Sequence, residues 1–388
     1  MTTQAELVTR VSALAPLLAA NAETAERERK PVDGVMEAVR DSDAYRYFVP
    51  KKYGGYEFGL DGFMQIGMAL GEGCLSTAWV TTFCMEHNWL LALFDQPAQD
   101  DLFGNAPFIV APGALAPNGV AAPVDGGYSL SGRWHWGTGV MHADWVLLGA
   151  VVAGPPEGKP QMSMFALPVD DIRIKDTWRV AGMAGTGSND IEATEVFVPA
   201  HRAVDLSLLR DGRSPGATLH NSALYRLPML PFLALTAAAP AVGAAQKAVA
   251  LFQERLAERV VYGAGGRQLD KPLAQARLGH AMVQAQMARA ALLRLAEEVS
   301  AFGDQEEPCS VAERARLRLQ ISHTVHMARD LVNSVVEASG ASAQFTHNPL
   351  QRIQRDLNTL SCHTVFDQDT GGELYGRVLL GLEPNAPV

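Results

Sequence analysis

The chain has 388 residues, of which 48% are hydrophobic and 19% are charged, so it can bury a large core and is not expected to be disordered. Its formal net charge of -10 and the lack of any run of basic residues argue against a nucleic-acid partner. Residues 1–7 have neither the basic start nor the apolar core of a secretory signal, so we expect a cytoplasmic protein.

The first hundred residues are predicted to be mostly helical. Apolar residues recur at helical spacing from position 5 to about 46, with a break at Pro31, which indicates two amphipathic helices. Asp61 is expected to cap a third helix that continues through Gly71, and Ser76 a fourth that runs to Phe94. We therefore assign residues 1–106 to an N-terminal helical domain.

The sequence pattern changes at about Pro107. Clusters of Gly, Pro, Asn and Asp then separate short apolar runs, which is typical of a compact antiparallel β domain. The runs cover residues 108–111, 128–130, 145–148, 162–167 and 195–198. Asp125-Gly126-Gly127 predicts a tight hairpin turn, because glycine tolerates the positive φ that such turns need. Residues 107–215 are assigned to this β-barrel or sandwich domain.

Helical periodicity returns after residue 218 and continues almost to the end. Ser310 to Glu313 matches a capping box at the start of one helix. The most apolar stretch, 227–245, contains three prolines and a glycine, so we expect a buried helix and no membrane span. Four long helices are expected, at residues 234–262, 272–302, 310–339 and 349–366. Residues 216–388 are assigned to a C-terminal four-helix bundle, which completes an α+β fold.

Cysteines and histidines give little sign of a disulfide or metal site. The four cysteines show no CxxC spacing and are expected to be free thiols. His323, His326 and Asp330 lie at helical spacing but have no third strong ligand nearby, so no metal is expected.

Five short motifs occur in an order that resembles the acyl-CoA dehydrogenase family. They are P-x-x-Y-G-G at 50–55, L-x-G-x-x-x-W-x-T at 130–138, F-V-P at 197–199, E-R-x-x-Y-G at 258–263 and R-D at 355–356. The resemblance covers nearly the whole chain. It implies the acyl-CoA dehydrogenase-like fold and a bound flavin.

On this resemblance, the segment around Trp136 contacts the flavin. Trp136 offers a flat apolar surface to the isoalloxazine ring. Thr138, two residues on, is expected on the same face of the strand, where its hydroxyl can hydrogen-bond near flavin N5. Gly185, Thr186 and Ser188 lie in a glycine-rich turn whose amides and hydroxyls can hold phosphate or ring oxygens.

Two arginines complete the flavin-binding set implied by the family motifs. Arg259 matches the cation for the flavin phosphates, and Arg355 belongs to the late R-D pair. Without the motifs, Arg259 is no more than an exposed helix charge, and Trp134 with Trp136 no more than an aromatic pair on one face of a sheet.

The C-terminal region separates two chemistries of this fold. Many acyl-CoA dehydrogenases place a catalytic glutamate nine residues after the arginine of the R-D pair, where this chain has Thr364. His363, beside it, matches the R-D-x6-H pattern of two-component flavin monooxygenases related to p-hydroxyphenylacetate hydroxylase. His87 matches H-x-W-x-x-A-x-F of the same branch.

The resemblance thus implies the oxygenase component of a flavin-dependent monooxygenase. Such a component takes reduced flavin, FMNH2 or FADH2, from a separate NAD(P)H:flavin reductase. With O2 it forms a C4a-hydroperoxyflavin that hydroxylates a small aromatic substrate, such as a phenol, an indole or a fused ring. His363 is then the base, His87 orients the substrate and Thr138 is the donor at N5. The family is usually tetrameric, which implies a homotetramer.

Two other interpretations stay open at this point. One is an acyl-CoA dehydrogenase with FAD and a displaced catalytic base, since some members carry the base on an earlier helix. The other is a non-catalytic flavin-fold binding protein. Residues 110–119 also lack the serine run common in the oxygenase branch, which points away from a simple phenol and towards an indole, a fused ring or a heteroatom.

Overall fold

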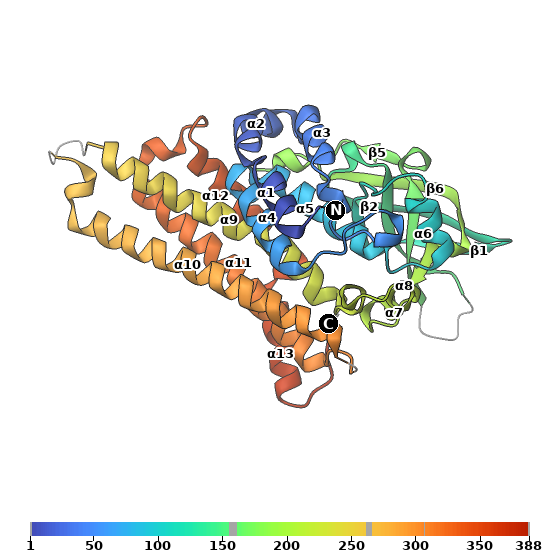
Figure 1. The fold of residues 1–388 in the computed structure, drawn as a ribbon. Helices are drawn as coiled ribbons and strands as arrows, with labels where there is room; N and C mark the ends of the chain where they lie inside the picture. The colour runs from blue at the N-terminus through green and yellow to red at the C-terminus, as the bar shows by residue number, and fades with distance from the viewer. Residues whose placement is uncertain (1, 155–160, 261–265, 306, 387–388) are drawn as a thin grey trace.

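A computed structural model describes residues 2–154, 161–260, 266–305 and 307–386. Figure 1 shows a long helical bundle at one end, a β-sheet at the other and the N-terminal helices packed where the two meet. One hydrophobic core joins the N-terminal helices to the bundle, and a second, smaller core lies within the β region. The bundle, the sheet and the N-terminal helices therefore meet in the middle of the molecule.

The N-terminal region is helical, as the sequence predicts. Its helices are α1 (Gln4–Ser12), α2 (Ala15–Glu28), α3 (Asp33–Asp41), α4 (Leu60–Gly73), α5 (Leu75–Leu91) and α6 (Gln96–Phe103). Three helices stand where two were expected before residue 46, because the chain bends after Ser12 and the left-handed Arg29 ends α2.

Neither side chain expected to cap α4 or α5 does so. Gly59 precedes α4, and Asp61 instead accepts a hydrogen bond from the side chain of Gln4 at 2.7 Å. Cys74 precedes α5, and Ser76 lies inside the helix, where its hydroxyl donates to Asp356. Both predicted caps were wrong because long-range partners hold the two polar side chains.

The central region forms one seven-stranded sheet. Its strands are β1 (Gly113–Val124), β2 (Gly127–Gly137), β3 (Trp145–Val152), β4 (Gln161–Pro168), β5 (Arg173–Lys175), β6 (Asn189–Pro199) and β7 (Ala203–Asp205). The strand order is β5-β6-β2-β1-β3-β4-β7. All neighbouring pairs are antiparallel except β1 and β3, which run parallel, so the sheet is mixed.

Two local predictions in the β region have opposite outcomes. Asp125 and Gly126 join β1 to β2 in the expected tight turn, with Gly126 at φ 75°. Residues 108–111 are not a strand. The N–H groups of Ile109 and Val110 donate to the side chains of Asn88 and Asp144 instead of to a neighbouring strand.

Helices form the rest of the chain. They are α7 (Leu206–Arg210), α8 (Pro215–Leu219), α9 (Met229–Glu258), α10 (Pro272–Ala301), α11 (Val311–Ser339), α12 (Pro349–Leu360) and α13 (Gln368–Leu379). Ser310 caps α11, accepting the N–H of Glu313 at 3.2 Å, but the Glu313 carboxylate pairs with Arg316 instead of completing the predicted capping box. The last long helix ends at Leu360 instead of at residue 366, which places His363 outside it.

Helix α9 is long and mostly apolar. It is long and apolar enough to cross a membrane by length and composition, yet 89% of its most apolar window is buried inside the protein. It crosses α4 with the two backbones in contact. A Cβ at Gly71 would collide with the carbonyl of Pro240, and one at Gly243 with the carbonyl of Met68.

Candidate functional site

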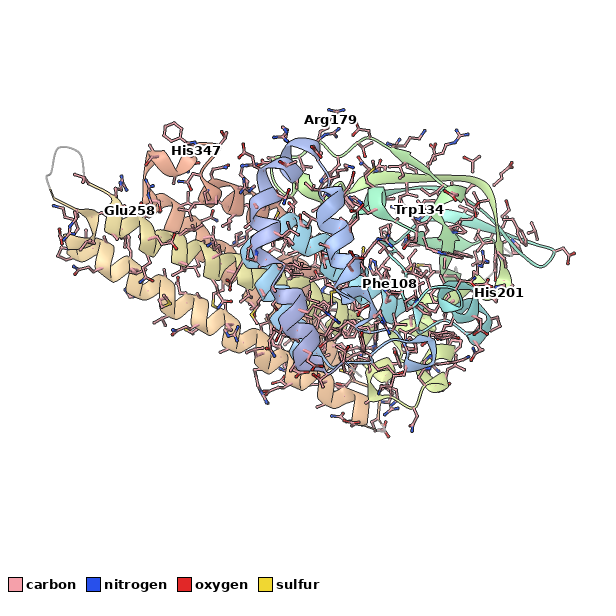
Figure 2. The ribbon with its side chains drawn as sticks, turned by 45° about the horizontal axis from the view of Figure 1, so that its top comes forward. Phe108, Trp134, Arg179, His201, Glu258 and His347 are labelled. Atoms are coloured by element: carbon pink, nitrogen blue, oxygen red, sulfur yellow. The ribbon has the colours of Figure 1, made fainter. Side chains whose placement is uncertain are left out.

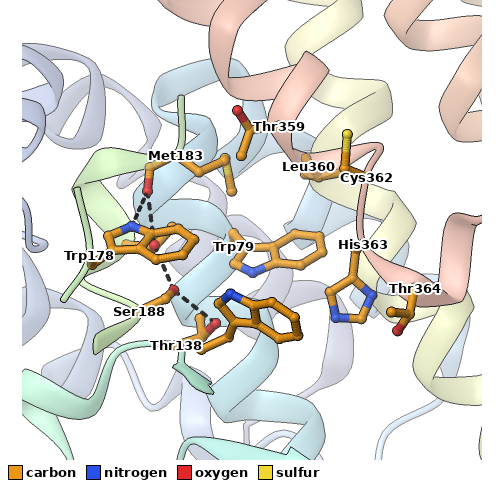
Figure 3. Close-up of a pocket in the computed structure, with 12 residues that line it drawn as sticks. Trp79, Thr138, Trp178, Met183, Ser188, Thr359, Leu360, Cys362, His363 and Thr364 are labelled. Atoms are coloured by element: carbon orange, nitrogen blue, oxygen red, sulfur yellow. Dashed lines mark hydrogen bonds between the residues drawn. The ribbon is translucent and has the colours of Figure 1, made fainter. Parts of the chain in front are cut away.

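A cavity of about 230 Å³ lies where the N-terminal helices, the sheet and the bundle meet. Its walls come from α5, the end of β2, the loop before β6 and the segment around the end of α12 (Figure 3). Twelve residues line it: Trp79, Trp136, Thr138, Trp178, Met183, Thr186, Ser188, Thr359, Leu360, Cys362, His363 and Thr364. Of the residues expected in the site, this wall contains Trp136, Thr138, Thr186, Ser188 and His363.

Trp136 and Thr138, at the end of β2, both line the cavity. They do not do so because they share one face of a regular strand, as the sequence predicted. Strand alternation does not bring them together, because Trp136 has φ 64° and its carbonyl accepts the N–H of Thr138 at 2.8 Å. The pairing with β6 also shifts register between Trp134 and Gly137. A positive φ at a non-glycine residue is strained, and such strain concentrates at functional sites.

The two tryptophans of β2 do not form a same-face pair. Trp134 is fully buried in the β core, where its indole N–H donates to the carbonyl of Gly149 at 2.6 Å. Trp136 is 62% exposed at the cavity. An aromatic face this exposed beside a cavity is available to stack on a flat ligand ring.

Three buried side-chain hydroxyls lie next to one another along the cavity wall. Thr138 Oγ1 lies 3.1 Å from Ser188 Oγ, which lies 2.7 Å from Thr186 Oγ1. Thr186 donates in turn to the carbonyl of Met183 at 2.9 Å, and the indole N–H of Trp178 donates to the same carbonyl (Figure 3).

The direction of this hydrogen-bond chain follows from its last member. A carbonyl can only accept, so the hydrogen of Thr186 points to Met183, and Ser188 donates to Thr186. Thr138 then donates to Ser188, which satisfies every buried hydroxyl. In this arrangement the hydroxyl oxygen of Thr138 faces the cavity as an acceptor, whereas the sequence suggested a donor.

The glycine-rich loop is fixed to the helices around it. Gly185 is buried but does not line the cavity; a Cβ there would lie 3.1 Å from the Cβ of Ser76. The backbone N–H of Met183 donates to Asp356 at 2.6 Å, and the hydroxyl of Ser76 donates to the same carboxyl at 3.2 Å. Burial raises the pKa of Asp356 to about 6. Asp356 therefore positions the loop.

Arg355, expected to bind the cofactor, is occupied by protein groups instead. Its guanidinium donates to the carbonyl of Ala181 and to Gln351, and pairs with Glu26 at 2.6 Å. It does not line the cavity. Arg355 supports the same loop from the side of α12.

Arg259 lies far from the cavity of its own chain. It follows the last residue of α9, a helix of 30 residues and thus about 45 Å long. Its guanidinium donates to the carbonyl of Ser339 at 2.8 Å and to Gln268 at 3.1 Å. Figure 2 places Glu258 in the outer part of the helical bundle and Trp134 in the sheet, on the other side of the N-terminal helices. The rest of its motif, at 261–263, lies outside the described residues.

His363 lies in the short segment between α12 and α13. Its ring points into the cavity beside Trp79, with ring centroids 5.7 Å apart (Figure 3). The ring is accessible on the cavity side while protein surrounds the rest, and desolvation, with the nearby charge of Arg318, lowers its pKa to about 4.

The tautomer of His363 is set by its backbone neighbour. Nδ1 accepts the N–H of Val365 at 3.3 Å, so a neutral ring carries its hydrogen on Nε2. Nε2 is then a donor. The base role expected from the sequence requires the other tautomer, in which the Val365 contact is lost.

His87 is buried on α5 and does not reach the cavity wall. Phe83 separates it from His363, with ring centroids 5.7 Å from His87 and 6.1 Å from His363. The Nδ1–H of His87 donates to the carbonyl of Ala111 at 2.6 Å, which leaves Nε2 as an acceptor. Desolvation lowers the pKa of His87 to about 4, so the ring is neutral at pH 7.

Two features of the wall bear on the choice between chemistries. None of the twelve lining residues is an aspartate or glutamate, and Thr364 stands at the position where many dehydrogenases carry their base. The sequence did not assign Trp79 and Trp178 to the site, although both line the cavity. Their apolar character alone could not distinguish them from core residues.

Comparisons with known proteins identify the family of this chain. Residues 235–368 match the family model for the acyl-CoA dehydrogenase C-terminal domain. The chain is 35% identical over 387 residues to the pigment production hydroxylase of Rhodococcus sp. (strain ATCC 21145), covering 100% of this chain and 99% of that protein. It is 33% identical over 377 residues to the flavin-dependent monooxygenase oxygenase subunit HsaA of Rhodococcus jostii (strain RHA1), covering 96% and 98%.

Solved structures give the same result. XiaF from Streptomyces sp., in complex with FADH2 and glycerol, superposes with a TM-score of 0.92 at 30% identity, covering 99% of this chain and 97% of that one. Identity above 30% over nearly the full length, with the same fold, shows that this chain belongs to the family of flavin-dependent monooxygenase oxygenase components built on the acyl-CoA dehydrogenase fold.

Proposed function

We propose that this protein is the oxygenase component of a two-component monooxygenase that hydroxylates a small aromatic substrate. Reduced flavin, FMNH2 or FADH2, supplies two electrons to O2, so that one oxygen atom enters the substrate and the other leaves as water. One observation carries the proposal. An exposed indole, a directed hydroxyl chain and a neutral histidine surround one cavity whose wall contains no carboxylate.

The cavity residues fit a reduced flavin. Trp136 provides the flat apolar face for the ring system. The oxygen of Thr138 is an acceptor, and reduced flavin carries its hydrogen on N5, so the two are complementary. Thr186 and Ser188 hold Thr138 in place from behind, and Gly185 and Arg355 keep the loop that carries them against α2 and α12.

His363 and His87 have complementary roles in this proposal. His363 donates a hydrogen bond through Nε2 into the cavity, where it can orient the substrate or the oxygen being transferred. His87 accepts a hydrogen bond through Nε2 from a phenolic O–H or an indole N–H that extends past Phe83. Trp79, Trp178 and Leu360 exclude water from the space between.

The proposed assembly is a homotetramer with a separate NAD(P)H:flavin reductase as its partner. Relatives named as oxygenase components or subunits require a source of reduced flavin, and NAD(P)H is a cytoplasmic pool, so we infer a cytoplasmic enzyme. Exposed apolar side chains favour contacts between copies. They are Leu273, Met282, Val283 and Met287 on α10, and Leu379, Leu380 and Leu382 at the end of the chain. Arg259, remote from its own cavity, would then serve a neighbour's flavin.

The test is single turnover with isotopically labelled O2. The protein is mixed anaerobically with FMNH2 or FADH2 and then with labelled O2 and a panel of phenols, indoles and thiophenes. Mass spectrometry should detect one labelled oxygen atom in a product. Release of all the oxygen as hydrogen peroxide with every substrate, or reduction of bound FAD by an acyl-CoA without a reductase, contradicts the proposal.

A further inference from the structure

Beside His87, helix α5 carries a carboxyl group with no assigned task. The side chain of Glu86 is 2% exposed and packs against α9. Within the described residues, no Lys or Arg pairs with it. Its polar neighbours are the hydroxyl of Thr236 and the ring of His87, whose Nε2 lies 3.8 Å from Glu86 Oε1. An ionised carboxyl buried without a cation is strongly disfavoured.

The hydroxyl of Thr236 has three acceptors within reach, which allows two arrangements of hydrogens around Glu86. Thr236 Oγ1 lies 3.0 Å from the backbone carbonyls of Phe232 and Leu233 and also contacts Glu86 Oε2. The hydroxyl has one hydrogen, and the carbonyls can only accept. If that hydrogen goes to the helix backbone, Glu86 must donate to Thr236 and is therefore protonated. This arrangement satisfies both side chains without any charge.

The protonation of Glu86 controls what His87 can do. The carbonyl of Ala111 fixes the hydrogen of a neutral His87 ring on Nδ1. A negative charge 3.8 Å from Nε2 would favour a second proton there and turn this nitrogen into a donor. A neutral Glu86 leaves Nε2 as an acceptor.

We propose that Glu86 is a positioning residue that acts as a neutral carboxylic acid, anchored to α9 through Thr236, and that it keeps His87 an acceptor for a substrate hydroxyl or indole N–H. The inference rests on the proposed function for its substrate class. This arrangement selects aromatic substrates that enter as neutral hydrogen-bond donors over phenolate anions, because among the described residues no Lys or Arg pairs with His87 or Glu86.

The surrounding groups agree with this assignment. Desolvation raises the pKa of Glu86 well above its ordinary value. On α5 the other titratable neighbour is Cys84, whose thiol pKa burial raises to about 12. The charged groups other than Glu86 that act on Cys84 are Arg40 and Asp144, which pair with each other at 3.0 Å. From α9, the group that contacts Glu86 is the uncharged Thr236.

Infrared difference spectroscopy and histidine NMR test the proposal on the full-length protein. Wild-type protein minus Glu86→Gln should show a protonated carboxyl band that persists from pH 6 to 9. Asp356→Asn is the matched control for the other deeply buried carboxyl, which should titrate near pH 6. In Glu86→Gln the amide can donate to Thr236 and keep its carbonyl toward His87. The ring of His87 should thus keep its pKa, and kcat/KM should stay within about threefold of wild type.

Several results would overturn the assignment. They are an ionised carboxylate band for Glu86 at pH 7, a fall of more than about one unit in the pKa of His87 in Glu86→Gln, or a loss of more than about tenfold in kcat/KM with unchanged melting temperature. Glu86→Leu, which keeps the bulk without hydrogen bonds, should raise KM more than Glu86→Gln does. If no aromatic substrate is turned over, the proposed function fails, but the infrared band and the His87 pKa still decide the state of Glu86.

Discussion

The carboxyl of Asp356, on α12, accepts the backbone N–H of Met183 at 2.6 Å and so joins the C-terminal helices to the loop that holds the hydroxyl chain. Asp356→Ala should lower the free energy of unfolding by about 2–4 kcal/mol, because it leaves a buried N–H without a partner. Asp356→Asn, which keeps an acceptor oxygen, should recover most of this loss. Urea unfolding measures both variants.

The same residue predicts a pH effect. The folded-state pKa of about 6 lies above the ordinary value of 3.8, so the folded protein binds this proton more tightly than the unfolded chain. Its contribution to stability is therefore present below pH 4 and is lost as pH rises to about 6, by up to about 3 kcal/mol. In Asp356→Asn this slope should disappear; an unchanged slope would mean that another group titrates there.

Thr138 should control how tightly oxygen use is coupled to product. Thr138→Val removes the acceptor facing the cavity and leaves Ser188 without its donor. We expect hydrogen peroxide to become the main product, with coupling reduced by about tenfold or more. Thr138→Ser keeps the hydroxyl and should stay near wild type. Peroxide and hydroxylated product are measured per reduced flavin consumed.

Trp136 should matter for flavin binding and little for folding. Its side chain is 62% exposed, so Trp136→Ala should change unfolding free energy by less than about 1 kcal/mol. Loss of the stacking surface should raise the Kd for reduced flavin by roughly 10- to 100-fold. Anaerobic fluorescence titration gives the Kd. A large drop in melting temperature with unchanged Kd would assign Trp136 to structure instead.

His363 should act as a donor over a wide pH range. With a pKa of about 4, the ring is neutral above pH 5, so no limb of the kcat profile between pH 5 and 9 should belong to it. His363→Asn, which retains an N–H donor, should keep more activity than His363→Ala, for which we expect a loss of about 100-fold. Equal loss in both variants, together with a limb in the wild-type profile that both variants lack, would favour the base role.

Variants of Arg259 test whether the flavin site is shared between subunits. If it serves a neighbouring subunit's flavin, Arg259→Ala and Thr138→Val homomers should each be impaired. Mixed oligomers should then regain activity, because some sites combine an intact Arg259 with an intact Thr138. Co-expression with two tags isolates the mixture. Homomers mixed after assembly serve as the control and should show no recovery.

Much of the fold could be predicted from periodicity, because long helices and short alternating strands leave a clear pattern. The wrong predictions concern residues whose hydrogen-bond partners lie far away in the sequence. Ser76 looked like a helix cap but bonds to Asp356, and residues 108–111 looked like a strand but bond to Asn88 and Asp144. Such contacts join positions up to 280 residues apart, and no local window contains them.

The sequence indicated which residues line the cavity better than it indicated which of their atoms donate or accept hydrogen bonds. Motif spacing found Trp136, Thr138 and His363, and the structure brings these residues to one cavity. Which atom donates and which accepts depends on backbone groups such as the carbonyl of Ala111 and the N–H of Val365. Every residue carries these groups, so their effect on tautomer and direction is visible only once the chain is folded.

The contact between α4 and α9 has a consequence for the rigidity of the helices that support the site. At Gly71 and Gly243 the two backbones pack directly against each other, because neither glycine has a side chain to hold them apart. A hinge motion at this crossing would have to separate two backbones that are in direct contact. The main-chain packing therefore resists separation of α4 from α9, and we expect the two helices to move as one unit. The cavity needs no such movement to reach solvent, because Trp136 in its wall is already 62% exposed.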